Sequence, residues 1–155
     1  MGSRANRVHL RQFEMSLSFT HLGTGSRGNS TLVESNDTKI LIDQGFSGKQ
    51  LETRLARMEI KPTEIDAILV THHHGDHGGG ASIAQKRWNI PIFCNDRTAT
   101  ALNLDLRNVR LFESLEALEF GDDLALLPVP VPHSGADNVA FVASHKGERG
   151  AVITD

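Results

Sequence analysis

The sequence has few residues that could form disulfide bonds, membrane-spanning helices or aromatic stacking platforms. Its single cysteine, Cys94, has no partner within the chain, so an internal disulfide is excluded and a reducing, cytoplasmic location is favoured. No apolar run approaches the roughly 20 residues that a membrane-spanning helix needs, so we expect a soluble protein without a membrane partner. Aromatic residues make up only 5% of the chain, and no cluster of them suggests a platform for nucleobases.

Charge gives equally little reason to expect nucleic-acid binding, because the formal net charge at pH 7 is -3. Residues 1–14 hold three arginines and one glutamate, which leaves 13 basic and 18 acidic residues in the rest of the chain, with no evident basic stripe. We interpret residues 1–14 as an extension, either an expression remnant or an upstream start, in preference to a weak targeting peptide. The chain as a whole is 39% hydrophobic, which suits one globular domain over residues 15–155.

Metal-binding side chains are concentrated in the middle of the chain. The apolar run 68–70 leads into Thr-His-His-His-Gly-Asp-His and then three glycines. An extended backbone sends alternate side chains to the same side, so His72 and His74 can converge on one ion. The glycine after them lets the chain turn, so that Asp76 and His77 can face a second ion. This pattern predicts a metal loop after a buried strand.

A glycine-rich stretch lies near the start of the domain. Residues 23–30 read Gly-Thr-Gly-Ser-Arg-Gly-Asn-Ser, which contains the G-x-G-x-x-G pattern of dinucleotide-binding proteins. That pattern must open a helix, whose N-terminus receives the pyrophosphate. Here residues 30–35 read as a strand instead. We therefore exclude nucleotide binding and expect a tight turn whose amides approach the active site.

Alternation of apolar residues and breaker residues predicts a layered α/β domain. The expected strands are 16–22, 30–35, 39–42, the stretch from 66 to 70, and then 90–93, 109–112, 124–131, 138–144 and 151–155. The expected helices are 47–58, 81–88 and 96–104, the last with Asp96 as N-cap. Pro128 and Pro130 place the strand 124–131 at an edge or a bulge. His145 lies at a predicted hairpin turn and reads as a surface residue.

The run Thr71, His72, His74, Asp76, His77 resembles the T-H-x-H-x-D-H signature of the metallo-β-lactamase fold superfamily. This resemblance implies an α/β fold, in some schemes α+β, built as a four-layer αββα sandwich with an internal pseudo-repeat. It also implies one or two bound metal ions, usually zinc, although histidines and carboxylates suit manganese or iron as well.

The resemblance extends to residues outside the loop. Asp43, at a strand end before a glutamine and a glycine, matches an aspartate that supports the metal loop without binding the ion. His133 matches the third metal-binding histidine, and Asp155 the aspartate that bridges two metals. The implied site has one ion on His72, His74 and His133, another on Asp76 and His77, and Asp155 between them.

The family's last metal-binding histidine lies downstream of the bridging aspartate, and Asp155 is the final residue. We therefore expect only the N-terminal part of the family architecture, which puts the second metal position in doubt. An open strand edge would follow, and with it self-association or a requirement for a missing C-terminal half.

A site of this kind predicts a metal-dependent hydrolase that uses a metal-bound hydroxide, with Asp76 orienting the water as partial base. Esters, amides, thioesters and phosphodiesters all suit such a nucleophile. The stretches 22–30 and 152–155 resemble the WalJ-like bacterial branch of the family, which implies a phosphodiesterase or exonuclease acting on nucleic acid. The alternatives are a small-molecule hydrolase of the thioester or lactam type, and a non-catalytic fragment or subunit that needs a partner.

Overall fold

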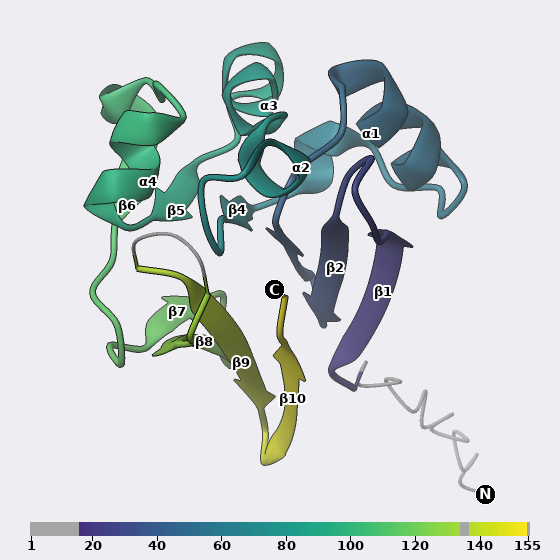
Figure 1. Cartoon of the computed structure of the whole chain (residues 1–155). Helices are drawn as coiled ribbons and strands as arrows, with labels where there is room; N and C mark the ends of the chain where they lie inside the picture. The colour runs from purple at the N-terminus through teal and green to yellow at the C-terminus, as the bar shows by residue number, and fades with distance from the viewer. Residues whose placement is uncertain (1–15, 134–136, 155) are drawn as a thin grey trace, which may run out of the picture.

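The computed structural model describes residues 16–133 and 137–154, which form two packed β-sheets with helices on one side (Figure 1). Side chains of the first sheet alternate between two apolar clusters. Leu32 and Leu41 pack beneath the helices, whereas their neighbours Val33 and Ile40 pack between the sheets. Helix, sheet and sheet thus give three of the four layers that the family resemblance implies.

The first sheet has the strand order β1-β2-β3-β4-β5-β6. β1, β2 and β3 form an antiparallel meander, and β3 to β6 run parallel. Because parallel strands end at the same edge, the loops that follow β3, β4 and β5 lie together. The strands are β1 Ser18–Gly23, β2 Ser30–Ser35, β3 Thr38–Ile42, β4 Ala67–Leu69, β5 Ile92–Cys94 and β6 Val109–Leu111.

The helices connect these strands and cover one face of the first sheet. They are α1 Gly48–Ala56, α2 Gly75–Gly78, α3 Ala81–Trp88 and α4 Asp96–Ala101, with 3₁₀ turns η1 Pro62–Glu64 and η2 Leu106–Asn108. Ser47 and Gln50 form a capping box that starts α1. No helix in the described ranges is both long and apolar enough to cross a bilayer.

The predicted cap of α4 is wrong by one residue. The N-cap is Asn95, whose side-chain oxygen accepts a hydrogen bond from the Thr98 amide at 2.8 Å. Asp96 is instead the first helical residue, where its charge faces the positive end of the helix. Both residue types serve as caps, so the sequence alone did not separate them.

The second sheet has the order β10-β9-β8-β7 and is antiparallel throughout. β7 pairs with β8 only as far as Leu126, so Pro128 and Pro130 lie where β8 has lost that neighbour. The edge position predicted from these prolines is confirmed for this half of the strand. β7 had no clear sequence signal. The strands are β7 Leu118–Phe120, β8 Leu124–Pro130, β9 Val139–His145 and β10 Glu148–Val152.

The surface position predicted for His145 is wrong. His145 is the last residue of β9, is 3% exposed, and lies with Nδ1 3.3 Å from the Asp123 carbonyl oxygen. β9 continues one residue further than its alternation suggested, and so pairs His145 with both Leu124 and Glu148. Tertiary pairing therefore buries a residue that the turn signal placed outside.

Close approach of two loops requires a glycine after β3. An added Cβ at Gly45 would lie 1.8 Å from the Asp76 carbonyl oxygen, and the Gly45 amide donates to the Asn29 carbonyl at 3.1 Å. The loop after β3 is thereby packed directly against the loop after β4.

Gly45→Ala should therefore lower the free energy of unfolding by about 1–3 kcal/mol or more, because backbone atoms must move apart to admit the methyl group. Urea unfolding followed by circular dichroism measures this change. Gly75→Ala is the matched control, since an added Cβ there meets nothing within 4 Å. Equal unfolding midpoints for the two variants would contradict the expected packing.

Candidate metal centre

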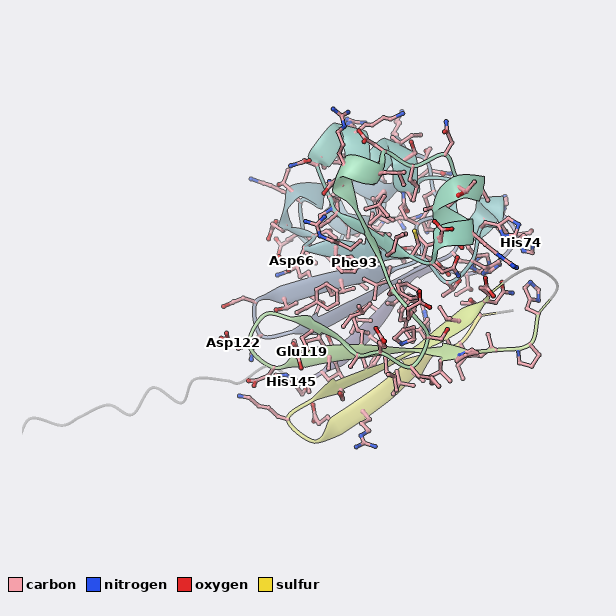
Figure 2. All side chains as sticks on the ribbon, turned by 90° about the vertical axis from the view of Figure 1, so that its left-hand side faces the viewer. Asp66, His74, Phe93, Glu119, Asp122 and His145 are labelled. Carbon is pink, nitrogen blue, oxygen red and sulfur yellow. The ribbon has the colours of Figure 1, made fainter. Side chains whose placement is uncertain are left out.

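The loops at one end of the two sheets bring the predicted metal-binding residues together. His72 and His74 follow β4, and His74 is the N-cap residue of α2. His133 comes from the other sheet, three residues after β8 ends. Figure 2 shows His74 at the opposite end of the molecule from Asp122 and His145. The candidate site therefore joins the two sheets at one end.

Three histidines form a compact group of nitrogen donors. Ligand atoms of His72, His74 and His133 all lie within 4.8 Å of one another. His72 Nε2 is 3.1 Å from His74 Nδ1. Two nitrogens at about 2.0–2.1 Å from a tetrahedral zinc ion lie about 3.3 Å apart, so the observed spacing suits such an ion. His73, between them in sequence, is not part of the group.

The protonation state of His72 favours metal binding. Burial, followed by the charges of His77, His74 and His133, lowers the pKa of His72 from 6.5 to about 4. The imidazole is therefore neutral near pH 7. A neutral ring carries the lone pair that a metal ion needs.

Asp76 and His77 form a second group beside the first. Asp76 Oδ2 lies 3.6 Å from His77 Nε2, and the rings of His72 and His77 have centroids 4.2 Å apart. His77 is buried, whereas the Asp76 side chain is 34% exposed. These two side chains face the same space, so they can serve a second ion next to the three histidines.

One carboxylate orients both groups from behind. Asp43 is 1% exposed; its Oδ2 lies 2.7 Å from His77 Nδ1, and its Oδ1 accepts from the Thr71 amide at 2.8 Å. Burial raises the pKa of Asp43, while hydrogen bonds from His77 and Thr71 oppose that rise. The structure thus places Asp43 directly behind the metal loop, in contact with Thr71 and His77.

Hydrogen bonds to Asp43 also select the tautomers of two histidines. His77 donates from Nδ1 to Asp43, so its lone pair is on Nε2, which faces Asp76. The Thr71 hydroxyl donates to Asp43 at 2.8 Å and lies 2.9 Å from His72 Nδ1. Since that hydroxyl proton is used, His72 donates from Nδ1 and its lone pair on Nε2 faces His74. Both lone pairs therefore point into the candidate site.

Sequence reasoning missed Asn29 as a site residue. Its side-chain nitrogen lies 3.3 Å from Asp76 Oδ2, 3.2 Å from the Asp76 carbonyl oxygen and 3.2 Å from His77 Nε2. Its side-chain oxygen accepts from the Gly25 amide at 2.8 Å. Asn29 thus ties the glycine-rich turn to the metal loop. An asparagine before a strand carries no sequence signal for contacts 47 residues away.

A cleft of about 610 Å³ opens beside Asp76, between the glycine-rich turn and the end of β10. The turn lines this cleft, and β2 follows it directly, so the strand predicted at residues 30–35 is confirmed. The cleft is lined by His21, Gly23, Thr24, Gly25, Ser26, Asn29, Ser30, Thr31, Ile42, Asp43, Asp76, Ala151, Val152, Ile153 and Thr154.

Asp155 and Cys94 are the remaining residues that the sequence singled out. Asp155, the expected bridging ligand, falls outside the described residues. Its neighbour Thr154 donates from Oγ1 to Thr71 Oγ1 at 3.3 Å, so the end of the described chain touches the metal loop. Cys94 is fully buried in the core, where burial raises the pKa of its thiol to about 12. A thiol in that state is no nucleophile at neutral pH.

Comparison with known proteins assigns this architecture to a family. The profile of the metallo-beta-lactamase superfamily matches residues 23–149. The crystal structure of BJP-1, a subclass B3 metallo-beta-lactamase of Bradyrhizobium japonicum, covers 90% of this chain and 59% of its own, with a TM-score of 0.72 and 18% identity. At this identity the likeness is one of fold, and it agrees with the fold expected from the histidine signature.

Three curated relatives have higher identities. Exodeoxyribonuclease YycJ of Bacillus anthracis is 30% identical over 146 residues, which are 91% of this chain and 55% of that protein. Exodeoxyribonuclease WalJ of Streptococcus pneumoniae is 33% identical over 116 residues, or 70% and 43%. Hydroxyacylglutathione hydrolase of Xanthomonas axonopodis pv. citri is 31% identical over 115 residues, or 72% and 40%. The chain therefore spans about half the length of these relatives.

Asn29→Ala should weaken divalent-metal binding about tenfold, because the Asp76 carboxylate loses the side-chain amide that lies 3.3 Å from its Oδ2. The alanine keeps both backbone hydrogen bonds of residue 29, so the effect isolates the side chain. Titration calorimetry with Zn²⁺ or Mn²⁺ measures the affinity. Asn108→Ala, which removes a hydrogen bond to Asn89 far from the histidines, is the control. Affinities that match the control would refute a positioning role for Asn29.

The lowered pKa of His72 should make the metal-free protein less stable on acidification between pH 6.5 and about 4. In this window the unfolded chain binds a proton at His72 that the folded chain does not, so the stability present at higher pH is lost as pH falls. The limiting slope is about 1.4 kcal/mol per pH unit. Urea unfolding in EDTA at several pH values should show a flatter dependence for His72→Asn than for His73→Asn. Identical slopes for the two variants would contradict a lowered pKa at His72.

Proposed function

Because this chain belongs to the metallo-β-lactamase superfamily, we propose that its histidine loop binds divalent metal ions and hydrolyses phosphodiester bonds, as an exonuclease acting on nucleic acid. The observation that carries this proposal is the convergence of His72, His74 and His133 beside Asp76 and His77, with Asp76 on the wall of a cleft. Nitrogen donors at this spacing suit zinc, and manganese or iron are alternatives.

The chain's own residues have distinct tasks in this proposal. His72, His74 and His133 would hold one ion, Asp76 and His77 would hold another, and the family resemblance makes Asp155 a further ligand of both. Divalent ions so held would supply a water molecule with a pKa near 7 and positive charge for the transition state. Within the described part of the chain, Asp76 is the metal-site carboxylate that is both partly exposed and on the cleft wall, so it would orient water and accept its proton.

Asp43 and Thr71 hold His72 and His77 in place through hydrogen bonds. Both are buried, at 1% and 0% exposure, behind the loop that they support. Rigid placement matters because ligands that must reorganise during the reaction lose much of their electrostatic effect on the transition state. These two residues therefore act on catalysis through His72 and His77.

The choice of nucleic acid rests on the relatives. Two proteins named exodeoxyribonuclease align with this chain at 30% and 33% identity. The cleft supports this choice with hydroxyl groups of Thr24 and Ser26 and a glycine backbone, which suit sugar and phosphate oxygens. Its volume of about 610 Å³ is of the size that small-molecule and nucleotide sites have.

A small-molecule hydrolase of the thioester or lactam type is the second candidate. A relative named hydroxyacylglutathione hydrolase is 31% identical over 115 residues, and the same fold is found in subclass B3 metallo-beta-lactamases. A metal centre alone does not determine whether the substrate is a phosphodiester, a thioester or a lactam. Two further alternatives stay predictions: that the chain is a non-catalytic fragment or subunit that needs a partner, and that it self-associates.

The metal-loaded chain should shorten 5′-labelled single-stranded DNA with release of 5′ nucleotides, and should hydrolyse bis-p-nitrophenyl phosphate faster than a thioester or a chromogenic lactam. Asp76→Asn should lower the rate at least about a hundredfold, because the amide cannot accept a proton. Asp122→Asn, at the far end of the molecule in Figure 2, should leave the rate unchanged. Faster turnover of the thioester or the lactam would favour the second candidate, and intact DNA at full metal occupancy would contradict the proposal.

A further inference from the structure

We propose that one face of α1 is a second binding site, which holds the phosphodiester backbone of a nucleic-acid strand whose end lies in the cleft. This face, the α1 basic face, consists of Lys49, Gln50, Thr53, Arg54 and Arg57 around a depression of about 240 Å³. At 100° per residue these five positions fall within an arc of about 140°, so they share one side of the helix. The inference rests on the proposed nuclease function for the identity of its ligand.

The α1 basic face has three cations and no acid in its lining. In the described ranges, no carboxylate lies within ion-pair distance of Lys49, Arg54 or Arg57, and Lys49 and Arg57 are exposed. Glu52, on the same helix, pairs instead with Arg87 of α3 at 3.0 Å. The helix thus directs its negative charge to a neighbouring helix and leaves positive charge around the depression.

Arg54 is fixed in place before any ligand arrives. Its guanidinium lies 4.1 Å from the centroid of the Phe46 ring, and its Nη1 donates to the Leu22 carbonyl. A solvated helix face usually carries long side chains that are free to move. An arginine already held by stacking and by one hydrogen bond loses less side-chain entropy when its other N–H groups bind a phosphate.

Gln50 adds a neutral donor. Its side-chain oxygen accepts from the Ser47 amide at 3.2 Å as part of the capping box of α1. With the oxygen used in this way, the NH₂ group is the part of the amide that can reach a ligand. The depression therefore offers N–H donors and positive charge together, which is the chemistry that phosphate oxygens require.

The glycine-rich turn connects the α1 basic face to the cleft. Gly23 lines the cleft, and a Cβ added there would lie 2.6 Å from the Phe46 ring and 3.1 Å from Arg54 Nη1. Figure 1 shows α1 beside the tip of the β1–β2 hairpin, where this turn lies. Arg27 is exposed in the same turn. A strand that leaves the cleft across the turn would pass Gly23 toward the α1 basic face, and Arg27 adds a fourth cation in the turn, in a protein whose net charge is -3.

Charge complementarity selects the occupant. A flexible single strand carries one negative charge per nucleotide along its length, so it can contact a cation in the turn and others on the helix at the same time. Nucleobase stacking contributes little, because the lining of the depression has no aromatic side chain. We therefore expect binding that depends on salt and on strand length and that is indifferent to base sequence.

The test is binding of a fluorescent 20-nucleotide single strand to the whole chain in EDTA, where no hydrolysis occurs, measured by anisotropy at several salt concentrations. Lys49→Gln/Arg57→Gln should raise Kd about tenfold at low salt and reduce the slope of log Kd against log salt by about 1.4, or two phosphate contacts. Lys86→Gln/Arg110→Gln removes the same charge near η2 and β6, and should change Kd less than twofold.

A kinetic measurement separates this inference from the proposed function. With metal bound, the Lys49/Arg57 variant should raise KM for the 20-mer and leave KM for bis-p-nitrophenyl phosphate unchanged, because the small ester does not reach α1. If the protein binds the 20-mer through α1 but hydrolyses no phosphodiester, the inference holds and the proposed function fails. Equal loss of binding in both double variants, or binding only to anionic lipid vesicles, would overturn the inference.

Discussion

The candidate site depends on one buried carboxylate. Asp43 receives hydrogen bonds from the Thr71 amide, the Thr71 hydroxyl and His77 Nδ1, and through that hydroxyl it also sets the ring of His72. These partners lie 28 and 34 residues further along the chain. They meet because β3 and β4 are parallel neighbours that end at the same edge. If the loop moved, the buried Asp43 carboxylate would lose these hydrogen-bond donors, and the folded state would be strongly destabilised. The loop therefore has one favoured arrangement.

Local sequence patterns predicted correctly those helices and strands whose ends are determined by neighbouring residues. The bounds of β2 and α3 agree with prediction, because alternation and flanking glycines define them without help from the rest of the fold. The four metal-loop residues also lie in one short stretch, whose spacing predicted two groups of ligands, although in the structure the helix α2 places Asp76 and His77. The convergence with His133 required the family resemblance, because sixty residues and a change of sheet separate it from His72.

Features that arise only from tertiary pairing could not be read from the sequence. Asn29 contacts Asp76 because the β1–β2 turn folds over the metal loop, and His145 is buried because β9 pairs on both sides. The α1 basic face was also missed. In the sequence Glu52 lies between its cations, and the chain as a whole has a net negative charge. The cations share one side only because the segment is helical.

The division of the histidines between the sheets has a mechanical consequence. His72 and His74 extend from the first sheet and His133 from the second, so an ion bound by all three would act as a cross-link between the two halves of the sandwich. Such a cross-link forms only in the folded state, and at a hundred times its dissociation constant it would add about 2.7 kcal/mol to the free energy of unfolding. Separation of the sheets and release of the ion would then be a single cooperative event, in which a chelator acts as a denaturant.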